Sequence, residues 1–305
     1  MPCVDAQAGN RWNIGSIGIA RIEERQAPSA FAPETFMTGF DMKVFTAHLH
    51  LMPGFYSPEQ HRLVSSMHSW LIRANGKRIL VDTCCGNHKE RPWMPGFHQL
   101  NTRYLENLRA QGVEPEDIDV VLCTHLHLDH IGWNTRLENG RWVPTFPNAR
   151  YLFSEREDAR WNPRRNPATD PNRAMSYDDS VLPVVQAGQA QLLSDGDQPL
   201  GSGFRIEPSP GHTPGHILVK LEDEGEKAVF SGDILHHPIQ VYQPDWNSFA
   251  CEAPEVARRT RREVLAYCAD EKALLFPAHF AAPHVAAIER TAEGFGVRYV
   301  PGAAA

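Results

Sequence analysis

The chain has 305 residues, of which 42% are hydrophobic and 22% charged, and its formal net charge is −7 at pH 7. This length can bury a large core as one domain or two smaller ones. The acidic balance argues against a nucleic-acid-binding protein, which needs a basic surface. We also expect no membrane association, because no hydrophobic run is long enough to cross a bilayer.

The cysteines show neither C-x-x-C pairs nor the spacing of a disulfide framework; they lie at positions 3, 84, 85, 123, 251 and 268. With no recognisable signal peptide, this pattern predicts a reduced, cytoplasmic protein. Cys84 and Cys85 follow a predicted strand. We interpret them as small residues that pack in a loop, with a redox or nucleophilic role as the alternative.

The first predicted elements are two strands and a helix. Residues 67–74 and 77–83 have strand composition and flank Asn75-Gly76, the strongest short signal for a β-hairpin. Residues 100–110 carry hydrophobic side chains at helical spacing, and Gly112 follows them. We therefore expect an amphipathic helix that ends at this glycine.

The next strand, predicted over 118–123, leads directly into the most informative segment of the chain. That segment, Thr124-His125-Leu126-His127-Leu128-Asp129-His130, holds three imidazoles and a carboxylate. Buried polar groups need partners, so core packing does not explain the cluster, whereas a divalent metal such as zinc does. His125 and His127 alternate in extended backbone and point to one side. Asp129 and His130 follow at a bend and can face a second metal.

The segment 158–179 is polar and contains several Asn-Pro and Asp-Pro steps. We expect a loop insertion here, in the long gap between His130 and His212. Long irregular segments inside a domain are usually functional or mobile. This one could form a lid over a metal cleft or the contact of a homodimer, and the sequence favours neither.

Three further predicted strands end in residues that bind metals. Residues 204–208 precede a loop rich in glycine and proline that contains His212; residues 227–233 end in Asp233; and residues 273–279 end in His279. Ligands spread over this length must converge on one site. We therefore expect a single domain over residues 1–305.

A last helix is predicted from Pro254 to about Ala269, with hydrophobic residues facing inward. It also carries four arginines, Arg258, Arg259, Arg261 and Arg262. We interpret them as a solvated helix face and not as a nucleic-acid patch, because the net charge is negative.

Taken together, these motifs resemble the metallo-β-lactamase superfamily of metallohydrolases. The matching residues occur in the family's order: His125, His127, Asp129, His130, His212, Asp233 and His279. In addition, Leu80-Val81-Asp82-Thr83 resembles the family's early strand, whose aspartate supports the metal site. The resemblance runs from about Met67 to His279. It implies an α/β fold of the metallo-β-lactamase type, a four-layer αββα sandwich.

The resemblance also implies a role for each ligand. His125, His127 and His212 would hold one zinc ion, Asp129, His130 and His279 the other, and Asp233 would bridge the two. Five neutral imidazoles and two carboxylates leave residual positive charge on such a site, which lowers the pKa of a bridging water. The expected enzyme is a dinuclear zinc hydrolase that uses a bridging hydroxide on a small-molecule ester or lactone, with Asp129 also handling the proton.

One position departs from the pattern of the quorum-sensing lactonases. Where these enzymes have a tyrosine that contacts the substrate carbonyl, three residues after the bridging aspartate, this chain has His236. An imidazole can also donate a hydrogen bond, so we predict a catalytic role for His236. The alternative is an ordinary histidine in a turn after a strand.

Two other functions remain open at this point. The same metals could hydrolyse a phosphotriester or an activated aryl compound, because their task is the same for each substrate. Persulfide dioxygenases resemble this ligand set but use one iron, which makes an oxidoreductase the further alternative. Metal analysis separates zinc from iron.

Overall fold

Two units that alternate along the sequence make up residues 9–304, the part of the chain that the computed structural model describes. In the described range, one unit (unit 1) comprises 9–16, 26–66 and 200–304, and the other (unit 2) comprises 17–25 and 67–199. The prediction of one domain over residues 1–305 stays a prediction. Cys3 lies outside the described residues.

Unit 2 is built on a mixed sheet with the strand order β2-β5-β6-β7-β10-β11. The bounds are β2 (Ile17–Pro28), β5 (Arg62–Ala74), β6 (Lys77–Val81), β7 (Val120–Leu122), β10 (Arg150–Ser154) and β11 (Ala190–Leu193). The predicted hairpin is confirmed: β5 and β6 pair antiparallel around Asn75 and Gly76, which both have positive φ. From β6 to β11 the pairing is parallel. The carboxyl ends of β6 and β7 therefore lie at one edge.

Short helices, 3-10 turns and a hairpin complete unit 2. They are η2 (Pro95–Phe97), α3 (Tyr104–Ala110), η3 (Pro115–Asp117), α4 (Leu128–Ile131), η4 (Gly132–Asn134), β8 (Thr135–Glu138), β9 (Arg141–Pro144), α5 (Glu155–Trp161), α6 (Pro171–Ser180) and α7 (Leu182–Gln186). The helix predicted over 100–110 begins only at Tyr104. Tyr104 and Leu108 from this helix join Val121 and Tyr151 of the sheet in one buried hydrophobic cluster.

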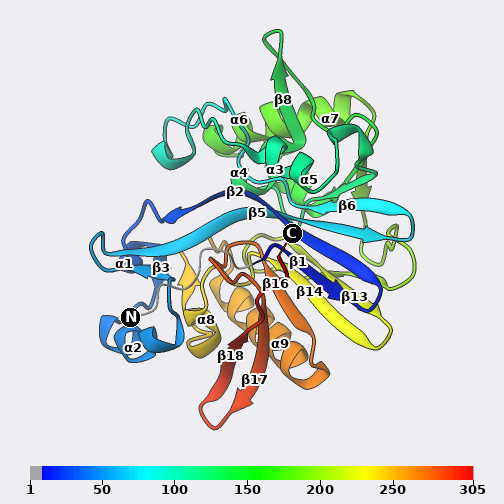
Figure 1. The fold of residues 1–305 in the computed structure, drawn as a ribbon. Coiled ribbons are helices and arrows are strands. Elements are labelled where there is room, and N and C mark those ends of the chain that lie inside the picture. The colour runs from blue at the N-terminus through cyan, green and yellow to red at the C-terminus, as the bar shows by residue number, and fades with distance from the viewer. Residues whose placement is uncertain (1–8, 305) are drawn as a thin grey trace. The chain divides into compact units, whose positions relative to one another are not determined.

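The prediction of an irregular loop over 158–179 was wrong. The segment contains the end of α5 and nearly all of α6 (Figure 1). Asp170 caps α6 by accepting hydrogen bonds from the backbone N–H groups of Asn172 and Arg173, and Pro171 occupies the first helical position. Asp-Pro is thus a helix start here, which a reading of proline as a loop residue missed.

Unit 1 contains a second mixed sheet, in the order β12-β13-β14-β16-β17-β18. Its strands are β12 (Phe204–Pro208), β13 (Ile217–Asp223), β14 (Glu226–Gly232), β16 (Leu274–Pro277), β17 (Ala286–Thr291) and β18 (Gly294–Tyr299). β14 and β16 run parallel, so both predicted ligand-bearing strands deliver their ends at the same edge. The other neighbours pair antiparallel.

The remaining elements of unit 1 are mostly short. They are β1 (Arg11–Ile14), α1 (Pro33–Phe36), β3 (Met37–Thr38), α2 (Met42–His48), η1 (Leu49–Leu51), β4 (Tyr56–Ser57), α8 (Ile239–Tyr242), β15 (Asn247–Ser248) and α9 (Pro254–Glu271). The helix predicted from Pro254 is confirmed as α9, the long helix beside the sheet in Figure 1. Leu265 and Cys268 on its inner face pack in the buried cluster of this unit.

One arginine of α9 contradicts the prediction of a solvated face. Arg261 is fully buried and donates to the carbonyl oxygens of Ile234 at 2.8 Å and Pro244 at 2.7 Å. It lies one turn after the buried Ala257 and one turn before the buried Leu265, on the inward side of the helix. Backbone carbonyls compensate its burial.

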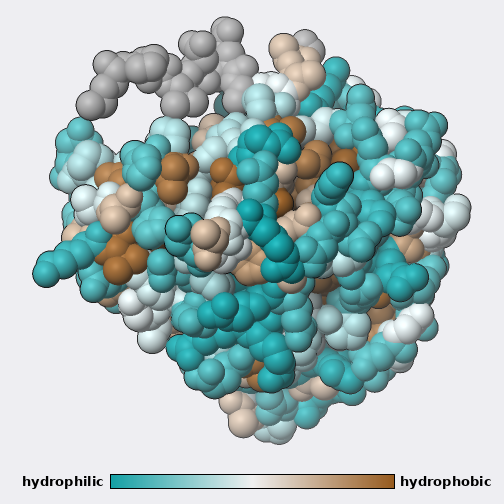
Figure 2. All heavy atoms as spheres, turned by 90° about the horizontal axis from the view of Figure 1, so that it is seen from below, coloured by the Kyte–Doolittle hydropathy of each residue, from teal (hydrophilic) through white to brown (hydrophobic). Residues whose placement is uncertain are grey.

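No helix among residues 9–304 combines the length and the hydrophobicity needed to cross a bilayer. On the face shown in Figure 2, hydrophobic residues are scattered in small groups among hydrophilic ones. Scattered hydrophobic residues are normal on a protein surface and do not by themselves mark a binding site.

Candidate metal centre

In unit 2 the four predicted ligands of the motif follow β7. The chain bends at Thr124 and His125, His127 is extended and precedes the first residue of α4, and Asp129 and His130 lie within that helix. The imidazole centroid of His125 is 4.5 Å from that of His127 and 4.1 Å from that of His130. All three histidines are buried, whereas the Asp129 side chain is 20% exposed. One turn thus gathers three imidazoles beside a carboxylate that solvent reaches.

Asp82 holds this turn in place from the end of β6. Its carboxylate accepts from the backbone N–H of Thr124 at 2.7 Å, from the Thr124 hydroxyl at 2.9 Å, and from Nδ1 of His130 at 2.8 Å. Asp82 has a φ of 58°, so β6 stops before it and the backbone turns. The supporting contact that the resemblance implied for Asp82 is present. It leaves Nε2 of His130 as the nitrogen available to a metal.

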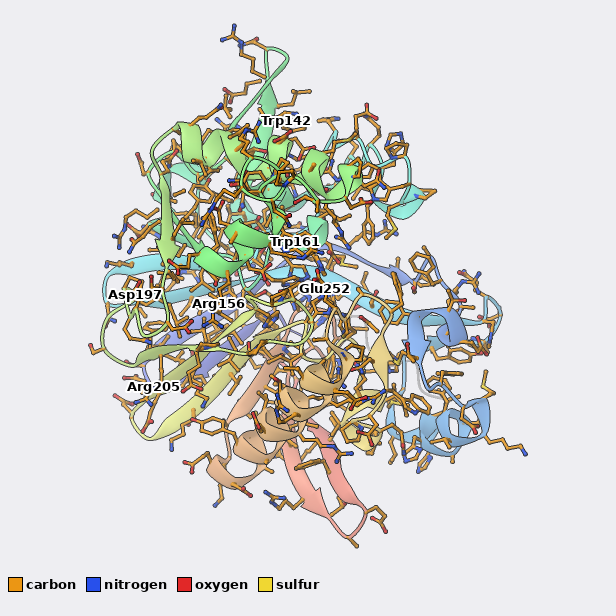
Figure 3. The ribbon with its side chains drawn as sticks, turned by 180° about the vertical axis from the view of Figure 1, so that it is seen from behind. Trp142, Arg156, Trp161, Asp197, Arg205 and Glu252 are labelled. Carbon is orange, nitrogen blue, oxygen red and sulfur yellow. The ribbon has the colours of Figure 1, made fainter. Side chains whose placement is uncertain are left out.

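A second buried carboxylate, not predicted from the sequence, also supports the motif. Glu157 of α5 is fully buried and accepts from the backbone N–H of Leu126 at 3.0 Å and from Nε1 of Trp161 at 2.7 Å. Trp161, labelled in Figure 3, has its ring centroid 5.4 Å from that of His127. Glu157 therefore fixes the peptide between His125 and His127, and the only clue was a glutamate at the start of a polar stretch.

In unit 1 the carboxylate of Asp233 is the centre of a group of imidazoles. Nε2 of His212 and Nε2 of His236 each lie 3.1 Å from its Oδ2, and Nε2 of His279 lies 2.9 Å from its Oδ1. Asp233 follows the last residue of β14 and His279 follows β16 after one residue. The structure thus brings together the three predicted ligands of this unit, and it adds His236 to them.

The Nδ1 atoms of His279 and His212 face fixed partners away from Asp233. Nδ1 of His279 lies 3.1 Å from the carbonyl oxygen of Ser66, and Nδ1 of His212 lies 3.6 Å from Sγ of Cys251. The backbone N–H of Asp233 donates to Nε2 of His216 at 3.1 Å, so His216 orients Asp233. His216 lies in the Gly/Pro-rich loop that also contains His212, but its contact with Asp233 joins residues distant in sequence and was not predictable.

His236 is a buried, neutral histidine. Burial is the largest effect on its pKa, followed by the opposing pull of Asp233, and the net result lowers the pKa to about 4. Its ring stacks with that of His279 at 5.7 Å, and its Nδ1 makes no hydrogen bond within residues 9–304. By contrast, Nδ1 of His284 lies 2.8 Å from the Phe280 carbonyl, which indicates a structural role for His284. A catalytic role for His236 stays a prediction.

Cys84 and Cys85 are buried in unit 2, and burial raises the pKa of both thiols well above the usual value. The backbone N–H of Cys85 donates to the buried carboxylate of Glu24 at 2.8 Å. A protonated, buried thiol is a poor nucleophile. These contacts favour the packing interpretation over the redox one.

The donor chemistry of both groups fits a zinc site. His130 in unit 2 and His279 in unit 1 each turn Nδ1 to a fixed oxygen and Nε2 towards a carboxylate, the arrangement that metal-binding histidines adopt. Imidazole nitrogens and carboxylate oxygens are ligands that zinc prefers. The prediction that both groups share two metals joins residues of different units and stays a prediction.

Comparison with known proteins identifies the family. The Metallo-beta-lactamase superfamily matches residues 64–279. An N-acyl homoserine lactonase, AiiA from Bacillus thuringiensis subsp. kurstaki, is 22% identical over 177 residues, which cover 58% of this chain and 62% of that protein. The chain therefore spans less than two thirds of this curated relative.

Two solved structures share the fold. The hydrolase AbOPH has a TM-score of 0.79 at 22% identity and covers 95% of this chain and 96% of its own. The dizinc quorum-quenching lactonase AidC has a TM-score of 0.78 at 22% identity and covers 96% of this chain and 97% of its own. The fold is that of the metallo-β-lactamases, as the sequence predicted, and the chain belongs to the Metallo-beta-lactamase superfamily.

Proposed function

We propose that the protein is a dinuclear zinc-dependent hydrolase that acts on a small-molecule ester or lactone. The observation that carries the proposal is the position of three imidazole nitrogens within 3.1 Å of the Asp233 carboxylate. In a core, three buried histidines around one buried carboxylate are costly unless they are paired or bind a metal. Membership of a family of metallohydrolases favours the metal.

Neither group of ligands is sufficient for two metals. Unit 2 offers His125, His127, Asp129 and His130, and unit 1 offers His212, Asp233 and His279, so two metals with three or four protein ligands each require both. We propose the assignment that the resemblance implies: His125, His127 and His212 for one zinc, Asp129, His130 and His279 for the other, and Asp233 between them. When bound, such ions supply a Lewis acid and lower the pKa of water towards neutrality.

Two residues of the chain have further tasks in this proposal. Asp129 is the ligand with a partly exposed carboxylate, and it is suited to take up and release the proton of the attacking water. His236 is neutral at pH 7, and a neutral imidazole has one N–H to donate. This ring lies against Asp233, with Nε2 3.1 Å from the carboxylate. We propose that, once Asp233 holds metal, the N–H would be directed at an oxygen of the substrate, the role that the resemblance gives to a tyrosine in the lactonases.

The curated relatives support a lactone or ester over other substrates. Several of them are N-acyl homoserine lactonases, although they are 22–27% identical over parts of their length. A small-molecule substrate is the proposed partner. The cytoplasmic location, the homodimer and the absence of a nucleic-acid partner stay predictions from the sequence.

The test is a hydrolysis screen on protein purified without chelator, with lactones, aryl esters and phosphotriesters as separate classes. We expect turnover of a lactone or ester that disappears on treatment with a chelator and returns with Zn²⁺. Turnover of phosphotriesters alone would transfer the proposal to that class. Hydrolysis of none of the three by zinc-loaded protein, or oxidation of a persulfide by iron-loaded protein, would contradict it.

A further inference from the structure

The Nδ1 atoms of the candidate ligand histidines do not all face the same kind of atom. Among the candidate ligands, Nδ1 of His125 lies 3.1 Å from the Thr124 hydroxyl, Nδ1 of His130 lies 2.8 Å from the Asp82 carboxylate, and Nδ1 of His279 lies 3.1 Å from a backbone carbonyl. These three partners are oxygen atoms. His212 faces a sulfur instead, Sγ of Cys251, at 3.6 Å.

The chain holds Cys251 opposite His212 by a tight pairing of two loops. The backbone N–H of Glu252 donates to the carbonyl of His212 at 3.0 Å, and that of Ala253 donates to the carbonyl of Gly211 at 3.0 Å. Glu252, the residue after Cys251, is labelled in Figure 3. The backbone N–H of Cys251 donates to Ser248, which ends β15. Backbone bonds on both sides of the cysteine therefore fix where its sulfur lies.

Gly211 allows the two loops to approach each other. It has a φ of +133°, and a Cβ atom at this position would lie 2.3 Å from the backbone nitrogen of Ala257 in α9. A side chain here would push the loop with His212 away from the start of α9, and so away from Cys251. The contact between sulfur and imidazole thus depends on a backbone that only glycine permits.

The proton on the ring follows from this geometry. Nε2 of His212 faces Asp233, where the metal is proposed, so Nε2 must be unprotonated when it binds and Nδ1 must carry the hydrogen. The atom that Nδ1–H meets is Sγ of Cys251. A cysteine sulfur accepts weakly and at longer distance than a carboxylate or carbonyl oxygen.

We propose that Cys251 is a positioning residue of the metal centre, whose sulfur accepts the Nδ1–H of His212 and thereby presents Nε2 to the metal. This inference rests on the proposed metal site. His212 would thus be supported by a sulfur, whereas His130 and His279 are supported by oxygens. The affinity of the metal bound by His212 would then depend on the thiol of Cys251. Partners of this kind typically contribute about 10- to 100-fold to metal affinity.

The experiment measures Co²⁺ binding to the full chain, because cobalt reports its coordination through its visible absorption. Wild type, Cys251→Ala and Cys251→Ser are titrated with Co²⁺ in competition with a chelator. Cys268→Ala is the matched control, since Cys268 is also buried in unit 1 but packs in the hydrophobic cluster. Circular dichroism checks that each variant is folded.

We expect Cys251→Ala to weaken one of two Co²⁺ ions about tenfold or more and to change the visible spectrum, while the other ion and Cys268→Ala bind as in wild type. Cys251→Ser should recover part of the affinity, since its oxygen accepts a hydrogen bond but reaches less far. A higher Co²⁺ affinity in Cys251→Ser than in Cys251→Ala would show that Cys251 acts as a hydrogen-bond acceptor and not only by packing. If Cys251→Ala does not fold, the difference between Cys251→Ser and wild type decides.

Two outcomes have distinct meanings. Wild-type protein that binds no Co²⁺ would contradict the proposed function itself. Wild-type binding of two ions, with affinity and spectrum unchanged in the folded Cys251 variants, would overturn the role of Cys251 and leave the proposed function standing.

Discussion

The two units present their candidate ligands in opposite ways. Unit 2 supplies four ligands from one continuous turn, and buried carboxylates of Asp82 and Glu157 hold that turn from other elements. Unit 1 supplies three ligands from three separate segments, the loop after β12 and the ends of β14 and β16, and they meet at Asp233. Their supports are a carbonyl oxygen, a cysteine sulfur and the imidazole of His216.

This difference indicates what holds the candidate ligands of each unit in position. In unit 2 all four ligands lie in one short segment, so their positions depend on side chains that hold this segment. Carboxylates do so strongly, because hydrogen bonds to a charged acceptor are stronger than those to a neutral one. In unit 1 the order depends on the sheet, since β14 and β16 run parallel and end together. Weak supports suffice there because the backbone already fixes the ligands. The predictions below test this contrast, beginning with the largest expected effect.

Asp233→Asn should have the largest effect. It removes the negative charge around which the imidazoles of unit 1 gather, together with one oxygen of the proposed bridge. We expect turnover to fall by orders of magnitude and one metal to be lost. Steady-state kinetics and metal analysis on the same preparation measure both. Unchanged turnover in a folded variant would refute the dinuclear mechanism.

His236→Ala tests the predicted catalytic role of the histidine that lies beside Asp233 together with the predicted ligands. Loss of one hydrogen-bond donor to the developing charge costs about 2–4 kcal/mol in the transition state, so turnover should fall on the order of a hundredfold with both metals retained. His236→Gln keeps an N–H donor and should recover part of the rate. Near-normal kinetics in His236→Ala would show that this histidine is structural.

Asp82→Asn allows the carboxylate support of His130 in unit 2 to be compared with the sulfur support of His212 in unit 1. It leaves His130 with a weaker acceptor and places an amide N–H against a donor, so we expect metal affinity to drop about 10- to 100-fold. Competition with a chelator gives the affinity. If the loss is smaller than that of Cys251→Ala, the idea that unit 2 depends more on its side-chain supports is wrong.

The smallest expected effect concerns Lys89, a buried residue of unit 2 that is not a candidate metal ligand, and the pH dependence of the free energy of unfolding. Nζ of Lys89 is buried 2.6 Å from the Thr135 hydroxyl and 3.5 Å from both an Asp179 oxygen and the ring centroid of Trp142. Burial lowers its pKa to about 7, although Asp179 opposes this. In the unfolded chain the pKa of a lysine is about 10.4.

The sign of the pH dependence follows from these values. Between about pH 7 and 10 the unfolded chain binds a proton that the folded chain does not, so stability rises with pH across this window. Below pH 7 both states are protonated and the cost of burying the charge is fully present. Lys89→Met should flatten the rise, which urea unfolding of metal-free protein at pH 7 and pH 9 measures. An equal slope in both proteins would show that Lys89 does not titrate there.

Much of the fold and the candidate ligands could be predicted because the relevant signals are local. Strand ends, the Asn75-Gly76 turn and the histidine motif are each readable within a few residues. Three of the misses share a cause. Glu157, Cys251 and the inward side chain of Arg261 act through contacts with residues distant in sequence, which composition does not reveal. Asp170-Pro171 is a local signal, but proline occurs both in loops and at helix starts, so the dipeptide alone does not distinguish them.

The central claim is that the ligands of both units bind two zinc ions together. Elemental analysis of protein purified without chelator tests it most directly. We predict close to two equivalents of metal per chain, mainly zinc. One equivalent of iron with a visible chromophore, or a folded protein with no bound metal and no affinity for Zn²⁺, would contradict the claim.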